Sequence, residues 1–225
     1  MIKKIVVCGD SFCSADTYRP GTHFSELLTT YGYEVVNLAR GGISNTGICF
    51  QIDTAIKLNP NAVIFSSTGS DRINIPIKNR TFDPTDGLKN FIYPYRCDSS
   101  TGTEYVGGLD AAIMSDVIPA FLNPRPDLPE LQFDPELVKI YITHFHDVEL
   151  EKKTDSWIIE YWKLILKQRS IPFIHLHTNG TIGQSMYRYV RNNPTKINQC
   201  VYHTDEKTQV EITNELVKEL ASVVK

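Results

Sequence analysis

Short apolar runs alternate along the chain with segments in which apolar side chains recur at helical spacing. β-branched and aromatic residues dominate the runs, which therefore predict buried strands at residues 3–8, 34–38, 62–66 and 171–177. Helices are expected between them, one over residues 23–31 that ends at Gly32 and one whose apolar face includes Ile48, Ile52, Ala55 and Ile56. Short β-α-β-α-β connections of this kind predict a right-handed, doubly wound parallel sheet.

Two further helices are expected in the second half of the chain. The first has Thr154 or Asp155 as its N-cap and carries on one side Trp157, Tyr161, Leu164 and Ile165. The second spans residues 205–224, and its spacing predicts an inward stripe of Ile212, Leu216, Leu220 and Val223. A last short strand is expected near residues 200–202.

Regular patterning fails in the middle of the chain. Residues 73–108 are rich in Pro, Asn, Asp, Gly and Tyr, which predicts a long excursion with room for a small hairpin. A helix is one reading of residues 110–122, and another is expected from Pro135 to Tyr141, behind Asp134 as its N-cap. We therefore predict one α/β domain over residues 1–225, a three-layer α/β/α sandwich with a parallel, flavodoxin-like sheet and an insertion after the third strand, at about residues 73–147.

Composition and charge exclude several classes of protein. No apolar run approaches the ~20 residues that span a bilayer, and no signal peptide is recognisable at the N-terminus, so we expect a cytoplasmic protein without a membrane partner. The 23 basic residues against 26 acidic ones give a net charge of -3, which argues against nucleic acid as a partner. The five cysteines are scattered without CxxC spacing, which favours reduced thiols over a disulfide framework or a zinc module. Neither a metal nor a cofactor is expected.

Polar segments follow the predicted strands at the carboxyl edge of the sheet, where ligands of doubly wound sheets bind. Each segment alone is equally typical of a turn between a strand and a helix, but their joint placement indicates a candidate site. The segments are Gly9-Asp10-Ser11, Gly41-Gly42-Ile43-Ser44-Asn45, Gly69-Ser70-Asp71 and His203-Thr204-Asp205.

The same segments resemble the sequence blocks of the SGNH (GDSL) hydrolases. Gly9-Asp10-Ser11-Phe12 is similar to the first block of that family, residues 37–42 to the second, Thr68-Gly69-Ser70-Asp71 to the third and residues 200–203 to the last. The resemblance covers both ends of the chain and leaves residues 73–147 without a counterpart. The central segments are similar to uncharacterised members of this family from tailed bacteriophages.

The resemblance implies a serine hydrolase that acts on an acyl ester, an esterase or deacetylase, with a small-molecule or carbohydrate ester as substrate. Ser11 would be the nucleophile and His203 the base that takes its proton. The oxyanion would be bound by the backbone amides of Ser11 and Gly42, together with the side chain of Ser70 or Asn45.

Supporting roles are expected for three acidic residues, namely Asp10, Asp71 and Asp205. Asp10 would cap the turn behind the nucleophile, and Asp205 is one candidate for holding the imidazole of the histidine.

Two positions depart from the family pattern. Ser70 stands where the family has an asparagine, and a serine hydroxyl donates only one hydrogen bond. Cys200 stands where the family has the acid that orients the histidine, which reduces the expected site to a Ser–His dyad or an incomplete triad. Two alternatives therefore stay open: a catalytically silent binding module of the same fold, and a structural or assembly protein.

Overall fold

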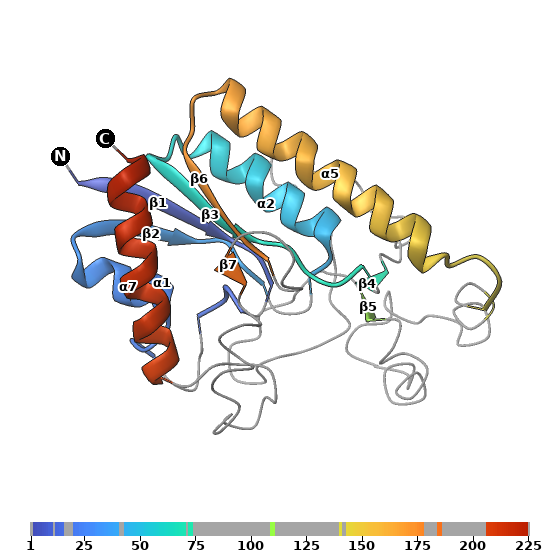
Figure 1. Ribbon diagram of the computed structural model, residues 1–225, viewed down its shortest axis with the longest axis horizontal. Coiled ribbons are helices and arrows are strands. Elements are labelled where there is room, and N and C mark those ends of the chain that lie inside the picture. Colours follow the sequence, from blue (N-terminus) through green and yellow to red (C-terminus); the bar gives the residue numbers. More distant parts are fainter. Residues whose placement is uncertain are drawn as a thin grey trace, which may run out of the picture.

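A parallel sheet forms the centre of the protein (Figure 1). The computed structural model describes residues 2–10, 12–15, 20–40, 43–70, 72–73, 109–110, 140, 143–177, 184–185 and 206–224. Within these residues the sheet has the order β2-β1-β3-β6-β7, and each neighbouring pair is parallel. Its strands are β1 (Lys3–Cys8), β2 (Tyr33–Asn37), β3 (Ala62–Ser66), β6 (Phe173–His177) and β7 (Gln184–Ser185). This is the doubly wound order of flavodoxin-like sheets, which confirms the predicted α/β fold class.

Helices cover both faces of the sheet and complete the three layers (Figure 1). The helices α1 (Phe24–Thr30) and α7 (Glu206–Val223) lie on one face, and α2 (Asn45–Lys57) and α5 (Val148–Gln168) lie on the other. Successive side chains of β1 point to opposite faces, so Ile5 and Val7 belong to the core under α1 and α7, while Val6 belongs to the core under α2 and α5. None of the helices in the described part of the chain is long and apolar enough to cross a membrane.

The pairing register brings the ends of three strands to one edge of the sheet. Cys8 at the end of β1 lies opposite Phe65 of β3, which in turn lies opposite His175 of β6. The segments that follow β1 and β3 therefore leave the sheet side by side. This is the edge at which the sequence places the candidate site.

A two-stranded antiparallel pair lies outside the main sheet. It joins β4 (Arg72–Ile73) to β5 (Leu109–Asp110). Asp110 is therefore part of a strand and not the first residue of a helix over residues 110–122, as one reading of the sequence had it. The rest of that segment and the strand expected at residues 200–202 lie outside the described residues. Of the helix expected from Pro135 to Tyr141 only residue 140 is described, and it is helical.

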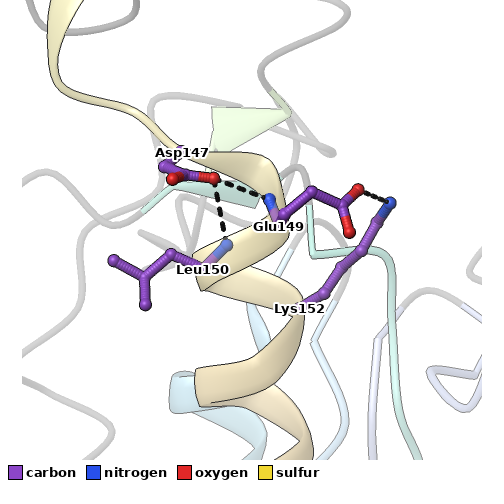
Figure 2. Close-up of polar contacts among 4 residues, drawn as sticks. All are labelled: Asp147, Glu149, Leu150 and Lys152. Carbon is purple, nitrogen blue, oxygen red and sulfur yellow. Dashed lines mark hydrogen bonds and ion pairs between the residues drawn. The ribbon is translucent and has the colours of Figure 1, made fainter.

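The helix α5 begins seven or eight residues earlier than predicted. Its N-cap is Asp147, whose carboxylate oxygen Oδ1 accepts hydrogen bonds from the backbone N–H groups of Glu149 (3.0 Å) and Leu150 (3.1 Å), as Figure 2 shows. The prediction of Thr154 or Asp155 as the N-cap was wrong. The first turn reads Val148-Glu149-Leu150-Glu151, in which apolar and polar residues alternate, and alternation is not the spacing that indicates a helix start.

The ends of the other elements differ little from the sequence prediction. In α7, Ile212, Leu216 and Leu220 are buried as expected, but Val223 is 37% exposed and Val224 takes the buried position. The strand β2 runs one residue earlier than predicted, and β6 begins at Phe173. Gly32, which follows α1, has a φ of +84°, in keeping with its expected role in ending that helix.

Candidate active site

The turn after β1 is held on both sides of Ser11, which itself lies outside the described residues. Asp10 is buried, and its Oδ1 accepts hydrogen bonds from the backbone N–H of Phe12 (3.1 Å) and from the hydroxyl of Ser66 (3.4 Å). The backbone N–H groups of Cys13 and Ser14 both donate to the carbonyl of Asp10, at 3.1 and 3.0 Å. A tight turn with a buried carboxylate cap therefore stands at the carboxyl end of β1.

A side chain of helix α2 forms hydrogen bonds with both backbone groups of Gly9, the first residue of this turn. The Gly9 N–H donates to Oε1 of Gln51 (2.5 Å), and Nε2 of Gln51 donates back to the Gly9 carbonyl (3.2 Å). Gly9 has a φ of +144°, and a Cβ there would meet the Ser66 hydroxyl and the Cys13 side chain. Both constraints require glycine at this position.

A buried histidine forms a hydrogen bond with the backbone of this turn. His23 is the N-cap of α1, where its Nδ1 accepts from the backbone N–H of Ser25 (3.2 Å). Because Nδ1 is an acceptor, the ring proton lies on Nε2, which donates to the carbonyl of Phe12 (3.0 Å). Asn37 at the end of β2 donates through Nδ2 to the carbonyl of Cys13 (2.8 Å) and to the hydroxyl of Ser25 (2.9 Å). The carbonyls that follow Ser11 in the chain are thus held by side chains from two other elements.

A second buried network joins α2, α5 and the segment after β3. Asn45 donates through Nδ2 to the carbonyl of Thr68 (2.9 Å) and to Oδ2 of Asp155 (2.7 Å), and its Oδ1 accepts from the Thr68 N–H (2.8 Å). The Ser70 side chain also forms a hydrogen bond with the Asp155 carboxylate. Both hydrogens of the Asn45 amide are therefore engaged, and the network fixes the course of the chain from residue 68 to residue 70.

The carboxylate at the centre of this network is deeply buried, with Asp155 6% exposed. Burial raises the pKa of Asp155 above its ordinary value of 3.8, and the hydrogen bonds from Asn45 and Ser70 partly offset that rise. Burial likewise raises the pKa of the Cys49 thiol, and the nearby Asp155 raises it further. When this carboxylate is ionised, it adds negative potential beside Ser70.

The thiol nearest to the turn is not a rival nucleophile. Cys13 is fully buried, and burial, with a further contribution from Asp10, raises the pKa of its thiol to about 12. A thiol with that pKa is almost entirely protonated at neutral pH, and the thiolate is the reactive form. The three cysteines in the described part of the chain, Cys8, Cys13 and Cys49, are all free.

A histidine on the neighbouring strand lies beside the segment after β3. Nε2 of His175 is 3.1 Å from the hydroxyl of Ser67, and the ring stacks on Phe65 with 4.4 Å between centroids. Ser67 is 6% exposed, which shields its hydroxyl from a substrate. This pair therefore stabilises the sheet edge. Across the described ranges no group of three or more His, Cys, Asp or Glu is placed to hold a metal ion.

Three of the predicted site residues can be placed. Asp10 follows β1, Asn45 opens α2 and Ser70 follows β3, and hydrogen bonds through Ser66, Thr68 and Asp155 link them to one edge of the sheet. The other predicted residues lie outside the described part of the chain, namely Ser11, Gly42, Asp71, Cys200, His203 and Asp205.

Sequence reasoning missed Gln51, Asp155 and the capping role of His23. A signal existed for Gln51, since it lies three residues after Ile48 on the apolar face of α2, where a polar side chain needs a partner. Asp155 carried a similar signal once the inward face of α5 is known, because it shares that face with Ile159 and Leu166.

The fold is an α/β sandwich, and the buried polar side chains of Asp10, Asn45 and Ser66 lie at the carboxyl edge of its sheet. Neither a protein-family model nor a curated protein matches the chain. Among solved structures, the chain is similar to TesA at 12% identity, with a TM-score of 0.41 and coverage of 98% of this chain and 99% of that one. It is also similar, at 12% identity and a TM-score of 0.39, to a putative lipolytic protein of the G-D-S-L family from Desulfitobacterium hafniense DCB-2, over 96% and 98% of the two chains. The fold assignment rests on the strand order.

Proposed function

We propose that the protein is a serine hydrolase of the SGNH (GDSL) type that cleaves an acyl ester, with Ser11 as its nucleophile. One observation carries the proposal. The residues on both sides of Ser11 form a turn at the carboxyl end of the central strand β1. Buried side chains of α2, β3 and the N-cap of α1, together with the half-buried Asn37 of β2, hold that turn. So many buried polar contacts around one short turn favour a positioned reactive group over an ordinary connection.

The reaction follows from the chemistry of these groups. His203 takes the hydroxyl proton of Ser11 while Oγ forms a bond to the acyl carbon, and the tetrahedral intermediate then expels the alcohol, which receives that proton. A water molecule, deprotonated by the same histidine, attacks the acyl-enzyme, releases the acid and restores the serine. No cofactor enters either step.

The contacts of Asn45 and Ser70 favour backbone amides over these two side chains as the donors to the oxyanion. Both amide hydrogens of Asn45 are donated to Thr68 and Asp155, so we assign Asn45 a positioning role and not that of an oxyanion donor. The Asp155 carboxylate also interacts with the Ser70 side chain and competes for its single hydroxyl hydrogen. The backbone amides of Ser11 and Gly42 are then the principal oxyanion donors, and Asp10, Asp71 and Asp205 keep supporting roles.

Hydrolysis of p-nitrophenyl acetate by purified variants tests the proposal. Ser11→Ala removes the nucleophile and is expected to lower kcat by at least about 10³-fold, and His203→Ala should do the same. Ser14→Ala, in the same turn, is the matched control and should leave kcat within a few-fold of the parent. A Ser11→Ala protein that keeps its activity refutes the assignment.

A catalytically silent binding module is the second candidate function. It is favoured by the engagement of the Asn45 and Ser70 side chains, which leaves fewer donors for an oxyanion. The two candidates differ in one readout. A folded protein that binds acetylated sugars and hydrolyses neither these nor p-nitrophenyl acetate would be the binding module.

A further inference from the structure

The outer face of α5 carries an apolar stripe. Its members are Leu150, Trp157, Tyr161 and Leu164, which are 58%, 69%, 57% and 51% exposed. With Thr154 included, the positions 150, 154, 157, 161 and 164 alternate four and three residues apart. An apolar repeat of 3.5 residues on average is typical of the contact surface between two helices in a coiled coil. A helix face in contact with solvent has no requirement for such a repeat. We call these five residues the outer stripe.

The other described elements pack on the opposite face of α5. Asp155, Ile159, Trp162 and Leu166 face α2 and the sheet, and at 100° per residue they lie roughly 150° around the helix from the outer stripe. In Figure 1 α5 is the outermost helix on its side of the sheet. Figure 2 shows Leu150 pointing to the other side of the helix from the Glu149–Lys152 pair. The sequence prediction had grouped Trp157, Tyr161 and Leu164 on one side of the helix, and the structure shows that this side faces solvent.

We propose that the outer stripe is a dimer interface, on which a second copy of this chain packs with its α5 antiparallel. The charges beside the stripe favour this occupant and this orientation. Lys153 directly precedes Thr154 and Glu160 directly precedes Tyr161, so the two charged residues border the outer stripe on the same side. Both are exposed, although Glu160 also pairs with Lys163 within the helix (2.6 Å). When two such helices pack antiparallel, the side chains along this border of one helix lie opposite the side chains along the same border of the other helix.

One antiparallel alignment satisfies shape and charge together. When Leu150 faces Tyr161 of the second copy, Thr154 faces Trp157, and Lys153 of each copy meets Glu160 of the other. The largest side chain then lies against the smallest, and the two-fold axis repeats the ion pair. A parallel pair would stack Trp157 on Trp157 and place Lys153 beside Ile158, without a charge partner.

The exposed area suits a dimer of moderate affinity. The two aromatic rings, at 69% and 57% exposure, leave on the order of 250 Å² of side-chain surface in solvent, because each ring buries about 150–250 Å² when fully covered. A standard interface covers about 800 Å² per partner. Leu150, Leu164 and, at the helix N-terminus, Phe145 (70% exposed) add to the area of the two rings, and Phe145 would lie near Leu164 of the second copy.

Charge exchange tests both the occupant and the orientation. Molar mass by light scattering at about 100 µM should be twice the chain mass for the parent protein. Lys153→Glu alone places two carboxylates against each other on both sides of the seam, and Glu160→Lys alone places two ammonium groups there, so each should weaken the dimer at least tenfold. An equimolar mixture of the two variants restores both ion pairs and should give a heterodimer.

The matched control is Lys152→Glu, because Lys152 is exposed on the same helix but pairs with Glu149 away from the stripe. It should leave the dimer intact, and circular dichroism should show that all three variants fold. A parent protein that is monomeric at this concentration overturns the proposal. So does a dimer that neither charge change weakens, or a mixture that stays monomeric. None of these outcomes depends on whether Ser11 is a nucleophile.

Discussion

The replacement Asn45→Ala tests the network that links α2, α5 and the segment after β3. Asn45 is 2% exposed and makes three hydrogen bonds, two to the backbone of Thr68 and one to Asp155. Alanine removes all three and leaves a buried N–H, a buried carbonyl and a buried carboxylate without that partner. Thr68 and Asp155 are themselves only 5% and 6% exposed, so water does not readily replace the amide.

The loss of stability can be estimated from these contacts. Each neutral hydrogen bond contributes about 1 kcal/mol net, and the bond to the carboxylate contributes about 2 kcal/mol. We therefore expect Asn45→Ala to lower the free energy of unfolding by about 4 kcal/mol. That is a large part of the roughly 5–15 kcal/mol by which proteins are stable.

Urea unfolding at neutral pH measures this change. The matched control is Asn214→Ala, since Asn214 accepts a hydrogen bond from the Tyr31 hydroxyl (2.8 Å) on the surface and its loss should cost less than about 1 kcal/mol. A double-mutant cycle with Asp155→Ala should give a coupling energy of about 1.5–3 kcal/mol. A loss below about 1 kcal/mol for Asn45→Ala, or a coupling near zero, would refute the reasoning.

Two further predictions concern the buried carboxylate and the turn glycine. Because burial raises the pKa of Asp155, the stability that its protonated form contributes is present below about pH 4 and is lost as the pH rises through the raised pKa. The unfolding free energy of the parent protein minus that of Asp155→Asn should therefore fall with rising pH and then level off, as urea unfolding from pH 4 to pH 8 would show. Gly9→Ala should cost about 3 kcal/mol or more, from the φ of +144° together with the collision of its Cβ with Ser66 and Cys13.

Each of these predictions has its own contradicting result. A stability difference that is constant or rises with pH would mean that Asp155 is not destabilised by ionisation in the folded state. For Gly9→Ala the matched control is Gly21→Ala, since Gly21 has a φ of +81° and nothing within 4 Å of an added Cβ. Equal costs for the two replacements would contradict the close packing around Gly9.

Sequence analysis located well the elements in which apolar side chains keep the same spacing from the first residue to the last. The buried run of β3 and the face of α2 defined by Ile48 and Ile52 carry their pattern from end to end, so local spacing was sufficient. In α5, apolar residues lie on two opposite faces. The pattern then predicted a helix but could not tell which face is inward, because that depends on contacts with α2.

At the candidate site, too, local sequence patterns do not report contacts between residues that are far apart in the chain. The Gly-Asp-Ser turn was visible because its residues are adjacent in the sequence, and the motif that begins at Asn37 was visible because it comes at the end of a strand. The contact between Asn45 and Asp155 joins positions 110 residues apart, and no local pattern reports it. The sequence therefore suggested Asn45 as an oxyanion donor, whereas its contacts tie both amide hydrogens to Thr68 and Asp155.

Labelling with a fluorophosphonate probe, followed by mass spectrometry of the modified peptide, tests the central claim most directly. Such a probe reacts with a serine whose hydroxyl is activated by a neighbouring base. We expect one phosphonylated residue, Ser11, in the folded parent protein and no labelling after His203→Ala. A folded protein that stays unlabelled, or one labelled at another serine, would contradict it.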